Sequence, residues 1–152
     1  MRRWLPMTMS IAAACGMAPA VAAAQGIARA TLEIGPSRHA WTASAPGPMI
    51  AARGQRALSL PILPAGTQPQ SAGIITSVRW RYSFTRVPPP DMQAYLCNPH
   101  RCVLLPGAEG KTEAFVGDDA AKGFVFAFRV PGQGSLAPSL QGRSNEVTVS
   151  YR

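Results

Sequence analysis

The chain has 152 residues, of which 47% are hydrophobic. That is enough to bury the core of one domain and too little chain for two domains of ordinary size. Its 15 basic and 7 acidic residues give a net charge of +8, which is typical of a solvated basic surface or of one that meets acidic partners such as cell-wall polymer, anionic lipid or an acidic protein. Nucleic acid is not an expected partner, because no run of basic residues interleaves with aromatic ones.

Residues 1–24 have the pattern of a cleavable signal peptide. Arg2 and Arg3 supply a positive start, and an apolar stretch with few polar interruptions follows. Small residues then precede the position at which we predict cleavage, between Ala24 and Gln25. The apolar stretch is shorter than the roughly 20 residues of a membrane span. We therefore expect export without a stable membrane anchor.

The general secretory route is the expected path of export. Cys15 follows alanines as in a lipoprotein signal, but the motif lacks Leu or Val at its first position. The Arg2-Arg3 pair lacks the flanking residues of the twin-arginine signal. Cleavage would leave 128 residues, of which we predict 25–38 to be a partly ordered N-terminal arm and 39–152 to be a single β-sandwich domain.

Short segments of strand-like composition recur along this domain, separated by proline- and glycine-rich turns. No long window holds the helical repeat of apolar residues. About eight short strands without helices indicate an all-β fold, an antiparallel β-sandwich, with a closed barrel as the alternative. In chain order the candidate strands are Ala40–Ala43, Met49–Ala52, Ala57–Leu60, Ser77–Thr85, Met92–Cys97, Arg101–Leu105, Thr112–Val116, Gly123–Val130 and Asn145–Tyr151.

The segment Ser77–Thr85 has the clearest alternation. One face carries only apolar or aromatic side chains, and the other carries polar ones, as in a strand with one face in the core. On this pattern Trp80 is a core residue, whereas Arg79 and Arg81 point outward. Arg79, Arg81 and Trp41 are the candidates for a partner surface, although Trp41 is also compatible with a place in the core.

Cys97 and Cys102 remain after removal of the signal peptide. In an exported chain such an even pair is expected to be oxidised. The loop between them is short, so the entropic stabilisation is only about 2 kcal/mol. We predict that the disulfide fixes the register of one hairpin.

The search for a catalytic or metal site finds no candidate. His39 and His100 lie at no ligand spacing from other donors, and Asp118-Asp119 is expected to be a solvated turn. No nucleophile, zinc or phosphate-loop motif is present. We therefore expect no enzyme activity, no metal and no cofactor. A carbohydrate-binding module for cell-wall peptidoglycan is one alternative, based on the sandwich, the basic charge and Trp41.

An ordered series of motifs resembles the flagellar protein FlhE family of Gram-negative bacteria. The series covers about residues 39–152 and consists of Trp80-Arg81-Tyr82, Leu96-Cys97, Arg101-Cys102-Val103, Pro131-Gly132-x-Gly134-x-Leu136-x-Pro138-x-Leu140 and Ser144-Asn145-x-Val147-x-Val149-x-Tyr151-Arg152.

The resemblance implies a non-catalytic accessory protein of the periplasm. It would contact the flagellar export apparatus or rod and filament proteins. There it would limit proton leakage or premature rod and filament assembly, acting like a chaperone. No binding residue is carried over from the family.

Overall fold

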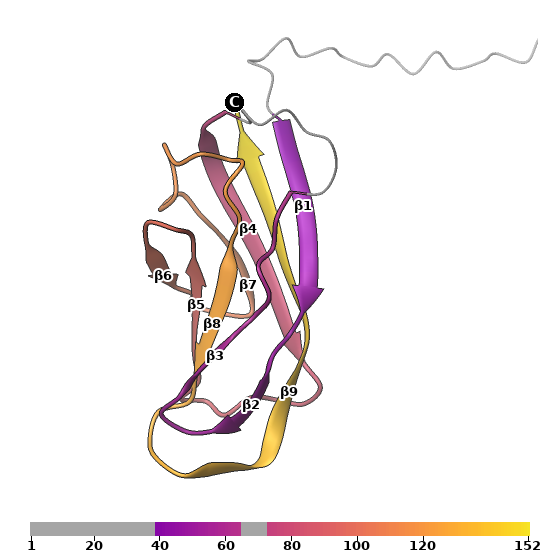
Figure 1. Cartoon of the computed structure of the whole chain (residues 1–152), viewed down its shortest axis with the longest axis vertical. Coiled ribbons are helices and arrows are strands. Elements are labelled where there is room, and N and C mark those ends of the chain that lie inside the picture. Colours follow the sequence, from indigo (N-terminus) through magenta and orange to yellow (C-terminus); the bar gives the residue numbers. More distant parts are fainter. Residues whose placement is uncertain (1–38, 65–72) are drawn as a thin grey trace, which may run out of the picture. The chain divides into compact units, whose positions relative to one another are not determined.

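Two antiparallel β-sheets make up the described part of the chain in the computed structural model, which covers residues 39–64 and 73–152 (Figure 1). These residues belong to one compact unit. The predicted signal peptide, its cleavage site at Ala24 and Gln25 and the predicted arm at 25–38 lie outside them. No helix within them is long and apolar enough to cross a membrane.

The larger sheet is built around its longest strand, β9. The strand order is β1-β9-β4-β7, and β2 pairs with the first part of β9. All of these pairings are antiparallel. The bounds are β1 (His39–Pro46), β2 (Met49–Ala52), β4 (Ile75–Phe84), β7 (Glu109–Thr112) and β9 (Ser135–Tyr151).

The smaller sheet has the order β3-β8-β5-β6 and is also antiparallel. Its strands are β3 (Arg56–Leu58), β5 (Gln93–Cys97), β6 (Cys102–Leu104) and β8 (Val125–Arg129). Hydrogen bonds from Ser59 to Phe126 and between Ile62 and Phe124 continue the β3 edge beyond Leu58. Two separate sheets, rather than one closed barrel, confirm the predicted sandwich.

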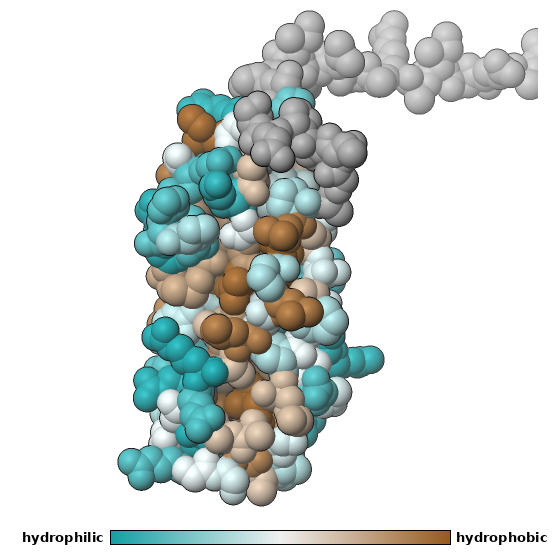
Figure 2. Space-filling view, viewed as in Figure 1, coloured by the Kyte–Doolittle hydropathy of each residue, from teal (hydrophilic) through white to brown (hydrophobic). Residues whose placement is uncertain are grey.

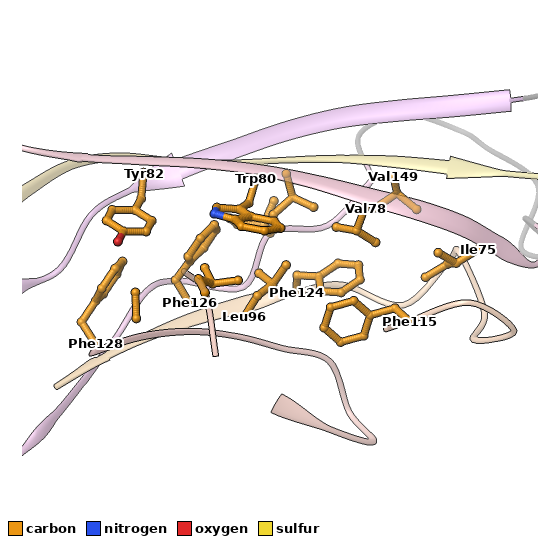
Figure 3. Close-up of a cluster of buried hydrophobic side chains, with 14 of the residues drawn as sticks. Ile75, Val78, Trp80, Tyr82, Leu96, Phe115, Phe124, Phe126, Phe128 and Val149 are labelled. Atoms are coloured by element: carbon orange, nitrogen blue, oxygen red, sulfur yellow. The ribbon is translucent and has the colours of Figure 1, made fainter. Parts of the chain in front are cut away.

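The core lies between the two sheets and consists largely of aromatic rings (Figure 3). Trp80 and Tyr82 of β4 face the other sheet, as the alternation of Ser77–Thr85 predicts. Opposite them lie Phe124, Phe126 and Phe128, all buried. Edge-to-face contacts join the layers, with Tyr82 and Phe128 centroids 5.2 Å apart. This interlayer packing is the main apolar contribution to the stability of the sandwich.

Strand β9 is longer than predicted. It starts at Ser135, whereas the predicted strand starts at Asn145. The prediction is too short because two residues typical of strand breaks lie inside the strand. Pro138 is tolerated since, within the ranges 39–64 and 73–152, this part of β9 pairs with β2 only, and proline is compatible with a strand that is unpaired on one side. Gly142 permits a close approach, because a Cβ there would lie 2.6 Å from the Cα of Gly47.

The predicted strand Thr112–Val116 is wrong. Strand β7 ends at Thr112, and a turn follows in which Val116 donates a backbone hydrogen bond to Glu113. Phe115 is nevertheless fully buried, edge-on to Phe124 at 5.0 Å between centroids. The turn, and not the alternation of a strand, buries this ring. The apolar side chain therefore lies in the core, but the strand predicted around it does not form.

Candidate functional site

The outer face of the larger sheet carries the two arginines singled out by the sequence. Arg79 and Arg81 alternate with buried residues of β4 and are exposed. In the ladder, Arg79 lies opposite Lys111 and Arg81 opposite Glu109, both on β7. These side chains, with parts of β9, line a hollow of about 450 Å³. The predicted outward orientation of both arginines therefore agrees with the structure.

The charges in this hollow partly offset one another. The Nε of Arg81 lies 3.5 Å from a Glu109 carboxylate oxygen, and both side chains are largely exposed. Such exposed pairs contribute about 0–1 kcal/mol. Among the residues that the structure describes, Arg79 makes no ion pair and faces the like charge of Lys111. Arg79 is therefore the cation in this hollow that is available to pair with an acidic group of a partner.

Trp41 does not join this surface. Its ring is 7% exposed, and its Nε1 donates a hydrogen bond to the carbonyl oxygen of Ala120 at 2.9 Å. The ring also packs against Phe124, with 6.5 Å between centroids. The structure therefore corrects the placement of Trp41 among surface candidates: β1 turns it toward the core, and its one polar atom is satisfied there.

The predicted disulfide between Cys97 and Cys102 is present. It joins the ends of β5 and β6, where the two cysteines are directly opposite in the ladder. Asn98 shapes the connecting loop, because its side-chain oxygen accepts hydrogen bonds from the backbone N–H groups of His100 and Arg101. The disulfide therefore does fix a hairpin register, as expected.

The sequence did not reveal how this hairpin is anchored. The Asp118 carboxylate accepts hydrogen bonds from Asn98 Nδ2 at 2.7 Å and from Arg101 at 2.8 Å. Its side chain is only 11% exposed, so it is not the solvated turn residue that was predicted. Arg101 also donates to the Ala114 carbonyl. No local sequence motif contains this contact, because the residues that form it are up to 20 positions apart in the sequence.

No arrangement for chemistry is found in the part of the chain that the structure describes. No three His, Cys, Asp or Glu side chains there come close enough to hold a metal ion. His39 lies against the Tyr151 ring, with 5.5 Å between centroids, and His100 is exposed in the disulfide loop. Burial raises the pKa of the Tyr82 phenol, but its surroundings are the aromatic core.

Comparison with known proteins assigns the family. The family described as "Flagellar protein FlhE" matches residues 47–152. The chain belongs to the FlhE family. The resemblance noted in the sequence is confirmed, and the matched region begins after β1.

Three FlhE relatives show the extent of the similarity. Flagellar protein FlhE of Escherichia coli (strain K12) is 39% identical over 112 residues, which is 74% of this chain and 84% of the relative. The protein of the same name from Salmonella typhimurium is 40% identical over 113 residues, 74% of this chain and 85% of the relative. The Yersinia enterocolitica protein is 31% identical over 112 residues, 74% and 80% of the two chains.

A solved FlhE structure shares the fold. The crystal structure of FLHE aligns with a TM-score of 0.71 and 38% sequence identity. The alignment covers 76% of this chain and 98% of the other. The antiparallel two-sheet architecture is therefore the fold of this family.

Proposed function

We propose that this FlhE-family protein is a periplasmic accessory protein of the flagellum that acts by protein–protein contact. It guards flagellar export and assembly by limiting proton leakage or premature rod and filament assembly, in the manner of a chaperone. The observation that carries this proposal is the family match over residues 47–152, since the relatives are named as flagellar proteins.

Two features support the compartment and the mode of action. The Cys97–Cys102 disulfide suits an oxidising compartment such as the periplasm, in line with the signal-peptide pattern of residues 1–24. The hollow at Arg79 and Arg81 is lined by exposed charged side chains, which suits the rim of a protein contact. The expected partners are the flagellar export apparatus or rod and filament proteins.

The carbohydrate-binding alternative loses its main argument. Sugar rings stack on exposed aromatic faces, but Trp41 is buried and bonded to Ala120. The basic charge remains as an argument for cell-wall contact. Retention of the protein on purified peptidoglycan at low salt would revive this alternative.

Deletion of the gene tests the proposal. The expected phenotype is altered swimming, filaments in the periplasm or a fall in cytoplasmic pH, and the intact gene should restore wild-type behaviour. A gene for the chain without residues 1–24 is the control for compartment, because its product should accumulate in the cytoplasm without restoring wild-type behaviour. Wild-type behaviour of the deletion strain in all three measurements would refute the proposed function.

A further inference from the structure

One row across the outer face of the smaller sheet is apolar, where a sandwich usually exposes polar side chains. Strand register places Leu58, Ala127, Tyr95 and Leu104 side by side in one row across β3, β8, β5 and β6. Leu58 is 60% exposed and Leu104 is 57% exposed. The larger sheet has arginine, lysine and glutamate at the corresponding outward positions. The two faces of the sandwich therefore differ in kind.

The apolar surface continues along the edge of the molecule. Leu60 and Leu63 follow β3 in the sequence and are also exposed. Beside Leu63 lies an apolar hollow of about 290 Å³ that includes Pro99 and Val125 in its lining. Figure 2 shows hydrophobic side chains along the middle of the face that carries β3 in Figure 1. Four exposed leucines on neighbouring elements, Leu58, Leu60, Leu63 and Leu104, favour a binding site here.

Strand β3 is also an open edge. Among the residues that the structure describes, it is the terminal strand of its sheet and pairs only with β8. The hydrogen bond from Ser59 N–H to the Phe126 carbonyl sets the alternation of the ladder. It follows that the N–H and C=O groups of Arg56 and Leu58 point away from β8. Within the described residues no partner is found for them. An open edge of this kind is a template for another strand.

Basic side chains stand at one end of this edge. Arg56 lies directly opposite Arg129 in the ladder, and neither pairs with a carboxylate among the described residues. The Arg56 guanidinium lies 6.0 Å above the centroid of the Tyr95 ring. A cation–π contact satisfies none of the N–H donors of a guanidinium. Arg56 can therefore keep this contact and still donate hydrogen bonds to an incoming carboxylate.

We propose that an extended segment of a protein partner adds to the smaller sheet as a strand beside β3. Its outward side chains extend the apolar rows, with one apolar residue opposite Leu58 and a second opposite Leu60. The partner residue opposite Arg56 is acidic. It lies two positions from the apolar residue opposite Leu58, so its carboxylate is on the same face. The recognised pattern is thus acidic-x-apolar-x-apolar, in either chain direction. This inference deepens the proposed function and rests on it for the compartment of the partner.

Two other occupants fit less well. A second copy of this chain, which has a net charge of +8 before removal of residues 1–24 with Arg2 and Arg3, would bring another positively charged molecule against the basic end of the edge, which opposes self-association. A lipid surface cannot satisfy the open N–H and C=O groups of Arg56 and Leu58, because hydrocarbon offers no hydrogen bonds. An acidic protein segment supplies both the backbone partners and the charge.

A labelled synthetic peptide tests the edge directly. Two probes are used, with the core Val-Thr-Val-Thr-Glu for an antiparallel strand and Glu-Thr-Val-Thr-Val for a parallel one, each flanked by Thr. Fluorescence anisotropy follows the binding of each probe to the purified, oxidised protein, and the probe that binds is used in the comparisons below. We expect saturable binding that weakens about tenfold in Arg56→Glu and is lost in Leu58→Asp. Exchange of the probe's Glu for Lys should weaken binding to the unmodified protein and restore binding to Arg56→Glu. That charge exchange separates recognition from an effect on folding.

Matched controls come from other surfaces of the molecule. Arg143→Glu makes the same charge change on β9, and Met49→Asp places the same carboxylate at an exposed apolar position of β2; both should bind the probe normally. Absence of saturable binding, or equal losses in Arg56→Glu and Arg143→Glu, would overturn the proposal. So would a dimer in sedimentation that Leu58→Asp dissociates, or Leu58-dependent binding to phosphatidylglycerol vesicles.

The peptide measurement tests the edge proposal and the deletion strain tests the proposed function, so one proposal can be refuted without the other. A deletion strain with the expected phenotype and a protein that ignores the probe would remove the edge proposal alone. A protein that binds the probe in a strain without a flagellar phenotype would remove the proposed function and leave the edge as a binding site.

Discussion

Replacement of Trp80 by Ala is the most direct test of the core. The indole is 5% exposed and lies between the sheets, and its Nε1 donates a hydrogen bond to the Gly107 carbonyl at 3.0 Å. Loss of a buried Trp side chain costs roughly 3–5 kcal/mol, and the unpaired carbonyl adds about 1 kcal/mol. Against the usual 5–15 kcal/mol of total stability, Trp80→Ala should be severely destabilising.

Urea unfolding followed by far-ultraviolet circular dichroism measures this loss without relying on the removed fluorophore. With a slope near 2 kcal/mol/M, a loss of about 4–6 kcal/mol should lower the midpoint by roughly 2–3 M. Gly110 provides a coupled control, because a Cβ there would lie 2.5 Å from Cζ2 of Trp80. Gly110→Ala alone should destabilise, but it should cost little once Trp80 is Ala. A loss below about 1 kcal/mol in Trp80→Ala would refute this account of the core.

Three further predictions concern the hairpin and the core tyrosine. The mature protein should have a mass about 2 Da below that of its reduced form because Cys97 and Cys102 each lose a hydrogen; free thiols in periplasmic material would contradict the bridge. Asp118→Ala should lower the free energy of unfolding by about 2–4 kcal/mol, since two hydrogen bonds to a nearly buried carboxylate are lost, and a neutral effect in the same urea assay would contradict the anchor. Burial raises the pKa of Tyr82 above its usual 10.0, so the folded state holds the phenolic proton more tightly than the unfolded state. That contribution is present below pH 10 and is lost as pH rises through the folded-state pKa; Tyr82→Phe should therefore show a flatter decline in thermal stability above pH 10.

Strand alternation made much of the fold predictable from the sequence. Val78, Trp80 and Tyr82 repeat with period two, and a half-buried strand is the simplest structure that buries all three. The hairpin at Cys97 and Cys102 was equally accessible, because export and an even cysteine count both favour a bridge.

Long-range contacts were not accessible in this way. The start of β9 was missed because Pro138 and Gly142 read locally as breaks, and their tolerance depends on which neighbours β9 has on each side. The anchor at Asp118 was missed for the same reason, since its partners come from a distant loop.

The candidate surfaces were predicted only in part. Arg79 and Arg81 follow from the alternation of one strand, so their outward orientation could be expected. Trp41 could not be assigned, because a single aromatic residue on a weak strand has no periodic signal to place it. The apolar row through Leu58 and Tyr95 arises from the pairing of four separate strands, and no local pattern contains it.

The position of β9 also sets the order of events in folding. It is the last strand along the chain, yet β1, β2 and β4 all pair with it, and Trp41 lies opposite Val149 in the ladder. The larger sheet therefore cannot assemble until the final residues have been synthesised, and contacts of such long range form slowly. For the export proposed above, this topology is favourable, because it delays folding of the larger sheet until the chain has been synthesised.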